Sequence, residues 1–122
     1  MYNQVRLKNW RKKGKYKSIS QNYKGKWYQS RLEAKVAQDL DWRIKAGELI
    51  EWKAQVKIDL RVNGLHITNY YIDFVATRAD GTKEYIEAKG LELPLWQLKW
   101  KLLEALRDEI MDKGDEMFVI KA

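Results

Sequence analysis

The chain has 122 residues, enough for one domain with a core of its own, and its lack of cysteine excludes disulfides and thiolate metal sites. It carries 24 Lys and Arg against 17 Asp and Glu, a net charge of +7, and no apolar stretch approaches the roughly 20 residues that span a bilayer. The basic N-terminus lacks the apolar segment of a signal peptide, so we expect a cytoplasmic protein without a membrane partner.

The positive charge is concentrated in residues 1–28, which hold nine basic and no acidic residues. Residues 29–122 hold the other 15 basic residues and all 17 acidic ones, a net of −2. Because Lys and Arg neutralise phosphates and aromatic rings stack on bases, we interpret 1–28 as an extended or partly disordered DNA-binding arm. A solvated tail that keeps the protein soluble is the alternative. The basic residues are Arg6, Lys8, Arg11, Lys12, Lys13, Lys15, Lys17, Lys24 and Lys26, interleaved with six Tyr and Trp residues.

The globular domain is expected to begin near Gln29 with a helix over residues 31–46. Ser30 and Glu33 have the spacing of a helix capping box, and Gly47 can end the helix. The apolar stripe that recurs every four residues consists of Leu32, Val36, Leu40 and Ile44.

Three strands in an antiparallel meander are predicted next, over residues 50–62, 65–77 and 82–89. The turns between them are Asn63-Gly64, a strong hairpin signal, and Asp80-Gly81. In the first strand, alternation assigns one buried face to Ile50, Trp52, Ala54, Val56, Ile58, Leu60 and Val62.

A second helix over residues 95–112 and a short strand over 117–120 complete the chain. Pro94 suits the first turn of a helix, and Gly114 ends it. The predicted core stripe is Leu95, Leu98, Leu102, Leu106 and Ile110; Trp96, Trp100 and Leu103 form a second stripe, which is either more core or a dimer contact. This order of elements predicts an α/β fold, a mixed sheet flanked by helices.

Two carboxylates and a lysine interrupt apolar strand segments. Asp73 lies within Tyr70–Ala76, and alternation places Glu87 and Lys89 on one face of the next strand. The hairpin brings Asp73 beside them. Carboxylates on apolar strands are costly unless they are paired or bind a cation, so this group requires an explanation.

A divalent cation provides one explanation. Mg²⁺ or Mn²⁺ prefers oxygen ligands, here the carboxylates of Asp73 and Glu87, with the Ala88 carbonyl as a third ligand. The ion would activate a water, while Lys89 would position that water or stabilise the developing charge. The alternative is a solvated Glu–Lys pattern on a strand with an edge-strand aspartate.

The set Asp73 … Glu87-Ala88-Lys89, preceded by a helix with Glu33 and followed by another helix, resembles the PD-(D/E)XK nuclease superfamily. Residues 32–36, 71–74 and 86–90 are similar to phage Holliday-junction resolvases of the T7 endonuclease I group and to small phage nucleases. The resemblance implies a restriction-endonuclease-like αβββαβ core over 29–122, and a Mg²⁺-dependent endodeoxyribonuclease that acts on branched DNA as a homodimer in a bacterial or phage-infected cell. Ile72 replaces the proline that names the superfamily.

Further residues are assigned with alternatives. Glu33 either completes the capping box or, as the resemblance implies, contacts metal-bound water or a second ion. Glu51 could add a carboxylate, and Lys99 could reach the scissile phosphate, although a lysine on a helix surface is often only solvated. A non-catalytic basic nucleic-acid-binding module on the same fold is the rival function. His66 receives no role.

Overall fold

The computed structural model describes residues 20–122; residues 1–19 lie outside the described part. A mixed four-stranded sheet has the order β3-β4-β5-β6, with β6 parallel to β5 and the other pairs antiparallel, which confirms an α/β fold with a mixed sheet. Within the described part, no helix has the length and apolar character needed to cross a membrane. The elements are β1 (Gln21–Tyr23), β2 (Lys26–Tyr28), α2 (Arg31–Lys45), β3 (Leu49–Val62), β4 (Leu65–Arg78), β5 (Lys83–Lys89), α3 (Pro94–Ala105), α4 (Arg107–Ile110) and β6 (Glu116–Lys121).

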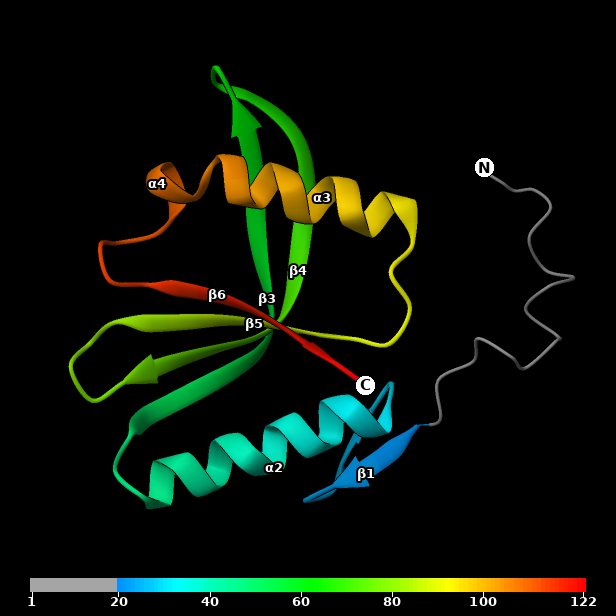
Figure 1. The fold of residues 1–122 in the computed structure, drawn as a ribbon, viewed down its shortest axis with the longest axis vertical. Helices are drawn as coiled ribbons and strands as arrows, with labels where there is room; N and C mark the ends of the chain where they lie inside the picture. Colours follow the sequence, from blue (N-terminus) through cyan, green and yellow to red (C-terminus); the bar gives the residue numbers. More distant parts are fainter. Residues whose placement is uncertain (1–19) are drawn as a thin grey trace, which may run out of the picture.

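The sheet buries two separate apolar clusters, one beneath α2 and one beneath α3 (Figure 1). Ile86 and Ala88 of β5 belong to the α2 cluster, whereas Tyr85 belongs to the α3 cluster. Successive side chains on a strand point to opposite faces, so β5 is covered on both sides. This explains why β5 is buried over almost its whole length.

On one face of the β3–β4 ribbon, the side chains pack in one apolar cluster up to Ile72 and in the other from Phe74 onward. Ile72 packs in the α3 cluster and Phe74 in the α2 cluster, although residues two apart on a flat strand point to the same face. On the neighbouring strand, Gln55 has a φ of 52°, a left-handed conformation that interrupts the regular pleat. The ribbon therefore twists at this level, and Asp73 lies at the twist.

Strand β4 parts from β5 at the same level. Their pairing runs from Thr77 opposite Lys83 to Phe74 opposite Ile86 and stops there. Beyond this point, the Ala88 N–H donates to Asp73 Oδ2 over 2.9 Å instead of to a backbone carbonyl. The Asp73 side chain thus replaces the ladder hydrogen bond where the strands diverge.

Helix α2 follows the prediction closely. The Ser30 hydroxyl accepts a hydrogen bond from the Glu33 N–H over 3.1 Å, as a capping residue should, and Gly47 follows the end of the helix with a φ of 83°. Val36 and Leu40 are buried, with Leu32 and Ile44 packed beside them. The predicted stripe is therefore confirmed.

Four details of the predicted helices and core are wrong. Val62 was predicted to be buried, but it is exposed beside the Asn63-Gly64 turn, where β3 ends. Ile50 is exposed because the register of β3 shifts between Leu49 and Glu51, so Leu49 takes the buried position. The single helix predicted over 95–112 is divided at Leu106 into α3 and α4.

On α3 itself, Leu95 and Leu98 point to solvent, with 63% and 65% of their surface exposed. Leu102, Leu106 and Ile110 of the first stripe pack in the α3 cluster as predicted. At the start of the helix, however, the sheet is covered by the second stripe, Trp96, Trp100 and Leu103. Trp100 meets the Tyr70 ring edge-on at 6.1 Å, and Trp96 stacks on Trp100 at 5.8 Å. These large rings bury more surface than the leucines would, which sets the rotation of the helix.

Residues 21–28 form a hairpin that packs on α2, whereas the sequence placed them in the arm. Tyr28 is buried against Phe74, with their ring centroids 6.3 Å apart, and the Tyr23 hydroxyl donates to Asp41 Oδ2 over 2.6 Å. Two of the arm's aromatic residues therefore belong to the folded domain. The remainder of the predicted arm, residues 1–19, lies outside the described residues.

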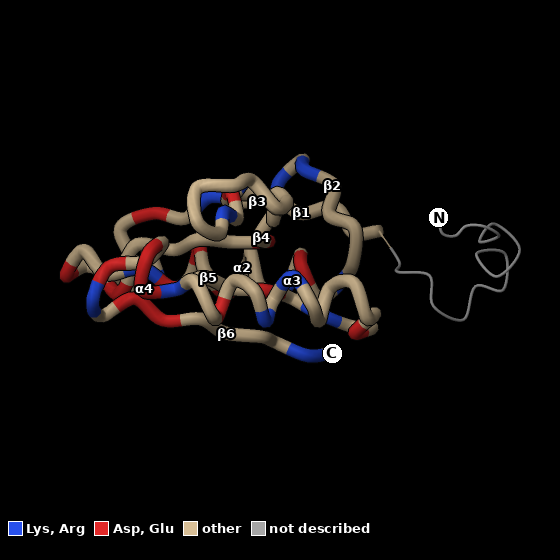
Figure 2. The backbone as a smooth tube through the Cα atoms, turned by 90° about the horizontal axis from the view of Figure 1, so that it is seen from above, with Lys and Arg blue, Asp and Glu red and all other residues tan. Residues whose placement is uncertain are grey.

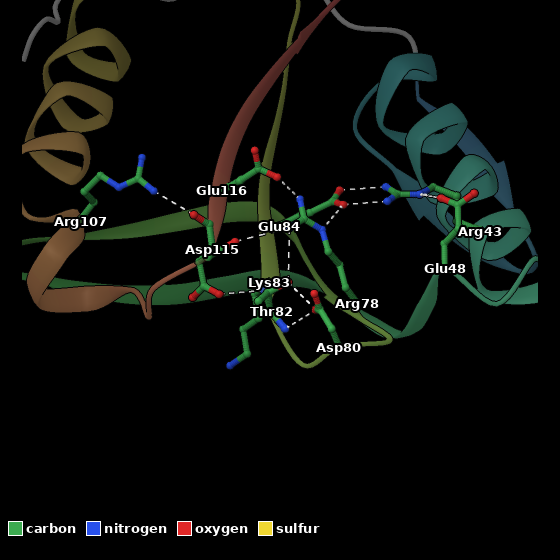
Figure 3. Close-up of polar contacts among 11 residues, drawn as sticks. Arg43, Glu48, Arg78, Asp80, Thr82, Lys83, Glu84, Arg107, Asp115 and Glu116 are labelled. Atoms are coloured by element: carbon green, nitrogen blue, oxygen red, sulfur yellow. Dashed lines mark hydrogen bonds and ion pairs between the residues drawn. The ribbon is translucent and has the colours of Figure 1, made fainter.

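At the start of β5, buried Glu84 joins four elements through charged groups (Figure 3). Arg43 of α2 donates to both of its oxygens over 2.8 and 2.7 Å, and Arg78 Nε donates over 2.9 Å. Arg78 also pairs with Glu116 of β6. The hydrogen bonds from Arg43 hold the pKa of Glu84 below its usual range. This cluster holds the start of β5 in place, at the end of the strand away from Lys89.

Candidate functional site

The structure brings together the three residues that the sequence singled out on the central strands. Asp73 of β4 and Glu87 of β5 are both buried, with only 8% and 3% of their surface exposed. Lys89 Nζ lies 3.1 Å from Glu87 Oε2. Two acids and one ammonium therefore meet where β4 and β5 separate, as the hairpin and the strand alternation predict.

Asp73 is held by both of its oxygens. Oδ2 accepts from the Ala88 N–H over 2.9 Å, and Oδ1 accepts from Gln55 Nε2 over 3.1 Å. Burial raises the pKa of Asp73, while these two hydrogen bonds and the charge of Lys89 offset part of the rise. The bonds fix the direction of the carboxylate. The contact of Ala88 in this group is made by its N–H, which donates to Asp73. Its carbonyl as a metal ligand stays a prediction.

Glu87 has one satisfied and one unsatisfied oxygen. Oε2 pairs with Lys89, whereas Oε1 is fully buried without a hydrogen-bond partner among the described residues. Burial and then the charge of Asp73 raise the pKa of Glu87, whereas Lys89 and the nearby Tyr70 hydroxyl lower it. A buried carboxylate oxygen without a partner is costly, so Oε1 has the coordination capacity that a cation or a water would fill.

Glu33 is the third carboxylate of the group, from the first turn of α2. Burial, followed by the charges of Asp73 and Glu87, raises the pKa of Glu33 to about 7. It lines a pocket of about 190 Å³ together with Gln55 and Asp73. Its backbone N–H is capped by Ser30, but no described hydrogen bond holds its carboxylate, so only one half of the predicted capping box forms.

A chain of contacts supports Lys89 from α3. Its ammonium lies over the Trp96 ring, 4.9 Å from the centroid, in a cation–π contact. The indole N–H of Trp96 donates to the Tyr70 hydroxyl over 2.8 Å. Burial and the charge of Glu87 raise the pKa of Tyr70, which keeps this hydroxyl protonated. The ring and the phenol together limit where the lysine and Glu87 can move.

Glu51 and Lys99 are not brought into this group. Glu51 pairs in register with Thr77 and lines a different hollow, with Lys53 and Lys83. The shift of register at the start of β3 and the twist at Gln55 separate it from the carboxylates. Lys99 Nζ lies 3.4 Å from the Asn69 carbonyl, to which it donates a hydrogen bond, on the stretch of β4 that precedes Asp73.

The nine basic residues of the predicted arm are divided between the β1–β2 hairpin, which holds Lys24 and Lys26, and residues 1–19, which are not described. Residues 20–122 carry 17 basic and 17 acidic residues, so the net charge of +7 comes from the seven Lys and Arg of residues 1–19. Lys24 pairs with Asp41 at 3.1 Å, and Lys26 lies over the Tyr28 ring. Figure 2 shows basic residues at the β1–β2 hairpin and a concentration of acidic residues around α4. The predicted contacts of residues 6–17 lie outside the described part.

Three residues of the site escaped the sequence analysis. Counting register from the Asn63-Gly64 turn would place Gln55 opposite Ile72; a one-residue shift between Leu60 and Arg61, which the sequence does not reveal, brings it level with Asp73. Tyr70 shares the face of Ile72, and Trp96 belongs to an apolar stripe, so neither carried a polar signal of its own. Their hydrogen bond depends on the rotation of α3, which only packing determines.

Asp73 and Glu87 supply carboxylate oxygens, the donors that a hard cation prefers, and Glu33 lies near enough for their charges to raise its pKa. Within residues 20–122, no group of three or more His, Cys, Asp or Glu side chains is arranged to hold a metal ion. Mg²⁺ commonly takes one or two carboxylates and completes its shell with waters and substrate phosphate, so Asp73 and Glu87 fit its requirements. Comparison of the chain with models of protein families, with curated proteins and with solved structures found no match.

Proposed function

We propose that the protein is a metal-dependent endodeoxyribonuclease that hydrolyses DNA phosphodiesters at the Asp73–Glu87–Lys89 group. The observation that carries the proposal is the buried Glu87 carboxylate beside Asp73, whose Oε2 pairs with Lys89 and whose Oε1 has no hydrogen-bond partner within residues 20–122. Two buried carboxylates with a single ammonium beside them lack one compensating charge, and ionisable groups perturbed in this way cluster at functional sites. A bound Mg²⁺ or Mn²⁺ would supply that charge, activate a water and polarise the phosphate.

The chain's own residues have separate tasks in this reaction. Asp73 and Glu87 would hold the cation, and the hydrogen bonds from Gln55 and the Ala88 N–H fix the direction of the Asp73 carboxylate. Lys89 stabilises the negative charge that grows on the phosphate as water adds to phosphorus and one P–O ester bond breaks.

Glu33 is placed to handle the proton. With a pKa of about 7, its carboxylate can accept a proton from the attacking water in the pocket near neutral pH. The products are a strand that ends in a phosphate and one that ends in a hydroxyl.

The substrate class follows from the resemblance to phage Holliday-junction resolvases and from charge. A homodimer would present two equivalent sites to the two strands of a branched DNA. The seven basic residues of 1–19 supply the affinity for phosphates. The rival function, a basic binding module without catalysis, has the same charge but no use for the buried acids.

Nicking of a supercoiled plasmid, with Mg²⁺ and with EDTA, separates the two functions. The wild type should nick only with Mg²⁺, and Asp73→Asn or Glu87→Gln should lower the rate by at least about 100-fold while DNA binding persists. Glu51→Gln, an exposed carboxylate of the same sheet, is the matched control and should cleave normally. If both buried variants nick at the wild-type rate, the proposal is wrong. Four-way junctions compared with duplex and single strands then define the substrate.

A further inference from the structure

One large side chain of the β1–β2 hairpin is left in solvent beside the proposed site. Trp27 has 69% of its surface exposed, while its neighbour Tyr28 is buried. Alternation along β2 accounts for this difference, since Tyr28 points into the core and Trp27 points away from it. An exposed indole offers a broad, flat apolar face that another ring can cover.

The hairpin is held firmly enough to position that indole. Tyr28 packs on Phe74, the residue after Asp73, and Tyr23 donates to Asp41 of α2. Lys24 at the turn also pairs with Asp41. These contacts hold the hairpin at its turn and at the end of β2, so Trp27 has a defined place relative to β4.

Trp27 lines the same pocket as two of the carboxylates. The pocket of about 190 Å³ is bounded by Lys26 and Trp27 on the hairpin, by Glu33 on α2 and by Gln55 and Asp73 on the central ribbon. A strand whose phosphate reaches Asp73 would therefore pass the indole, and Lys26 adds a positive charge for its backbone. Duplex bases are already stacked on each other, so only an unpaired base could stack on Trp27.

We propose that Trp27 is a stacking platform for an unpaired nucleobase next to the scissile phosphate. This inference rests on the proposed function, and it names the substrate class as DNA with an unpaired base at the cut, such as a branch point or a bulge. Aromatic stacking tolerates every base, so recognition would depend on DNA structure rather than sequence. Trp27 is then a specificity residue and not a catalytic one.

The test compares two DNA probes in Ca²⁺ or EDTA, with the whole 122-residue chain. One probe carries 2-aminopurine in a bulge, and the other carries it in a matched duplex; fluorescence quenching reports stacking and titration gives the affinity. The variants are Trp27→Ala and Trp27→Phe. Trp42→Ala is the control, because Trp42 is 58% exposed on α2 but lies outside the pocket, about 14 Å further along the helix axis than Glu33.

We expect Trp27→Ala to weaken binding of the bulged probe by at least about fivefold and to abolish quenching, since a stacked base contributes at least this much. Trp27→Phe should keep most of both signals, and duplex binding should change by less than about twofold, as should every measurement on Trp42→Ala. Equal losses of Trp27→Ala on both probes, or unchanged binding of the bulged probe, would overturn the inference.

The outcomes also separate this inference from the nuclease proposal. If the wild type cleaves plasmid DNA and Trp27→Ala binds the bulged probe as tightly as the wild type, the nuclease proposal is supported and the role of Trp27 is refuted. If the wild type quenches 2-aminopurine through Trp27 but does not cleave DNA, the role of Trp27 is supported and the nuclease proposal is refuted.

Discussion

Replacing Glu33 by glutamine should make the metal-free protein more stable above neutral pH. The pKa of Glu33 rises from 4.5 to about 7 on folding because of burial and the charges of Asp73 and Glu87. Between these two values, the folded state holds a proton that the unfolded chain has already released. The free energy of unfolding therefore falls as pH rises from 4.5 to 7, and the loss is complete above 7.

The size of the effect follows from that rise. A change from 4.5 to about 7 corresponds to about 3 kcal/mol, and screening by solvent at this half-buried side chain reduces it to about 1–2 kcal/mol. Glutamine carries no charge at any of these pH values, and it keeps the backbone N–H that Ser30 caps. The variant should gain about 1–2 kcal/mol at pH 8, or about 4–10 °C in melting temperature, and nothing at pH 4.5.

Thermal melts from pH 4.5 to 8.5 in EDTA provide the measurement, with Glu51→Gln as a control that should follow the wild type. Adding Mg²⁺ should reduce the advantage of Glu33→Gln, because a cation relieves the repulsion among the carboxylates. If Glu33→Gln melts with the same pH dependence as the wild type, the three acids do not interact as described.

Three further variants test other parts of the structure. Glu84→Ala leaves two arginines without their partner and should lower the free energy of unfolding by about 2–3 kcal/mol in urea; a smaller change than in Asp59→Ala, an exposed ion pair, would contradict this. Trp96→Leu should slow cleavage about tenfold at unchanged DNA affinity, and Trp96→Phe, which keeps a ring under Lys89, should recover part of the rate; equal rates in all three proteins would remove the supporting role. Deleting residues 1–19 removes seven positive charges, so DNA binding should weaken and its dependence on salt should flatten; an unchanged salt slope would refute the arm.

Local rules were sufficient for the central strands and for the site on them. The order of the strands follows from the two short turns, although the β3–β4 register that the Asn63-Gly64 turn sets shifts by one residue at Leu60. Alternation alone placed Glu87 and Lys89 on one face, and their ion pair confirms it. Such predictions succeed because a hairpin register and a strand period are both determined within a few residues.

What the sequence did not predict depends on contacts between distant segments. The strands of the β1–β2 hairpin have three residues each, too short for a period to appear, and their place is decided by Tyr28 on Phe74. The face of α3 is decided by Trp96 and Trp100 against Tyr70, in competition with an equally regular leucine stripe. The left-handed Gln55, at which the ribbon twists and Glu51 is separated from the site, carries no residue signature of its own.

The most direct test of the central claim is to measure Mn²⁺ binding to the wild type and to Asp73→Asn. Titration calorimetry or electron paramagnetic resonance detects the bound ion. Asparagine keeps an acceptor for the Ala88 N–H, so the fold should persist while one ligand charge is lost. The account predicts that the wild type binds Mn²⁺ and that Asp73→Asn loses the ion, with Glu51→Gln unaffected. A wild type that binds no ion, or an Asp73→Asn protein that binds it equally well, would contradict the account.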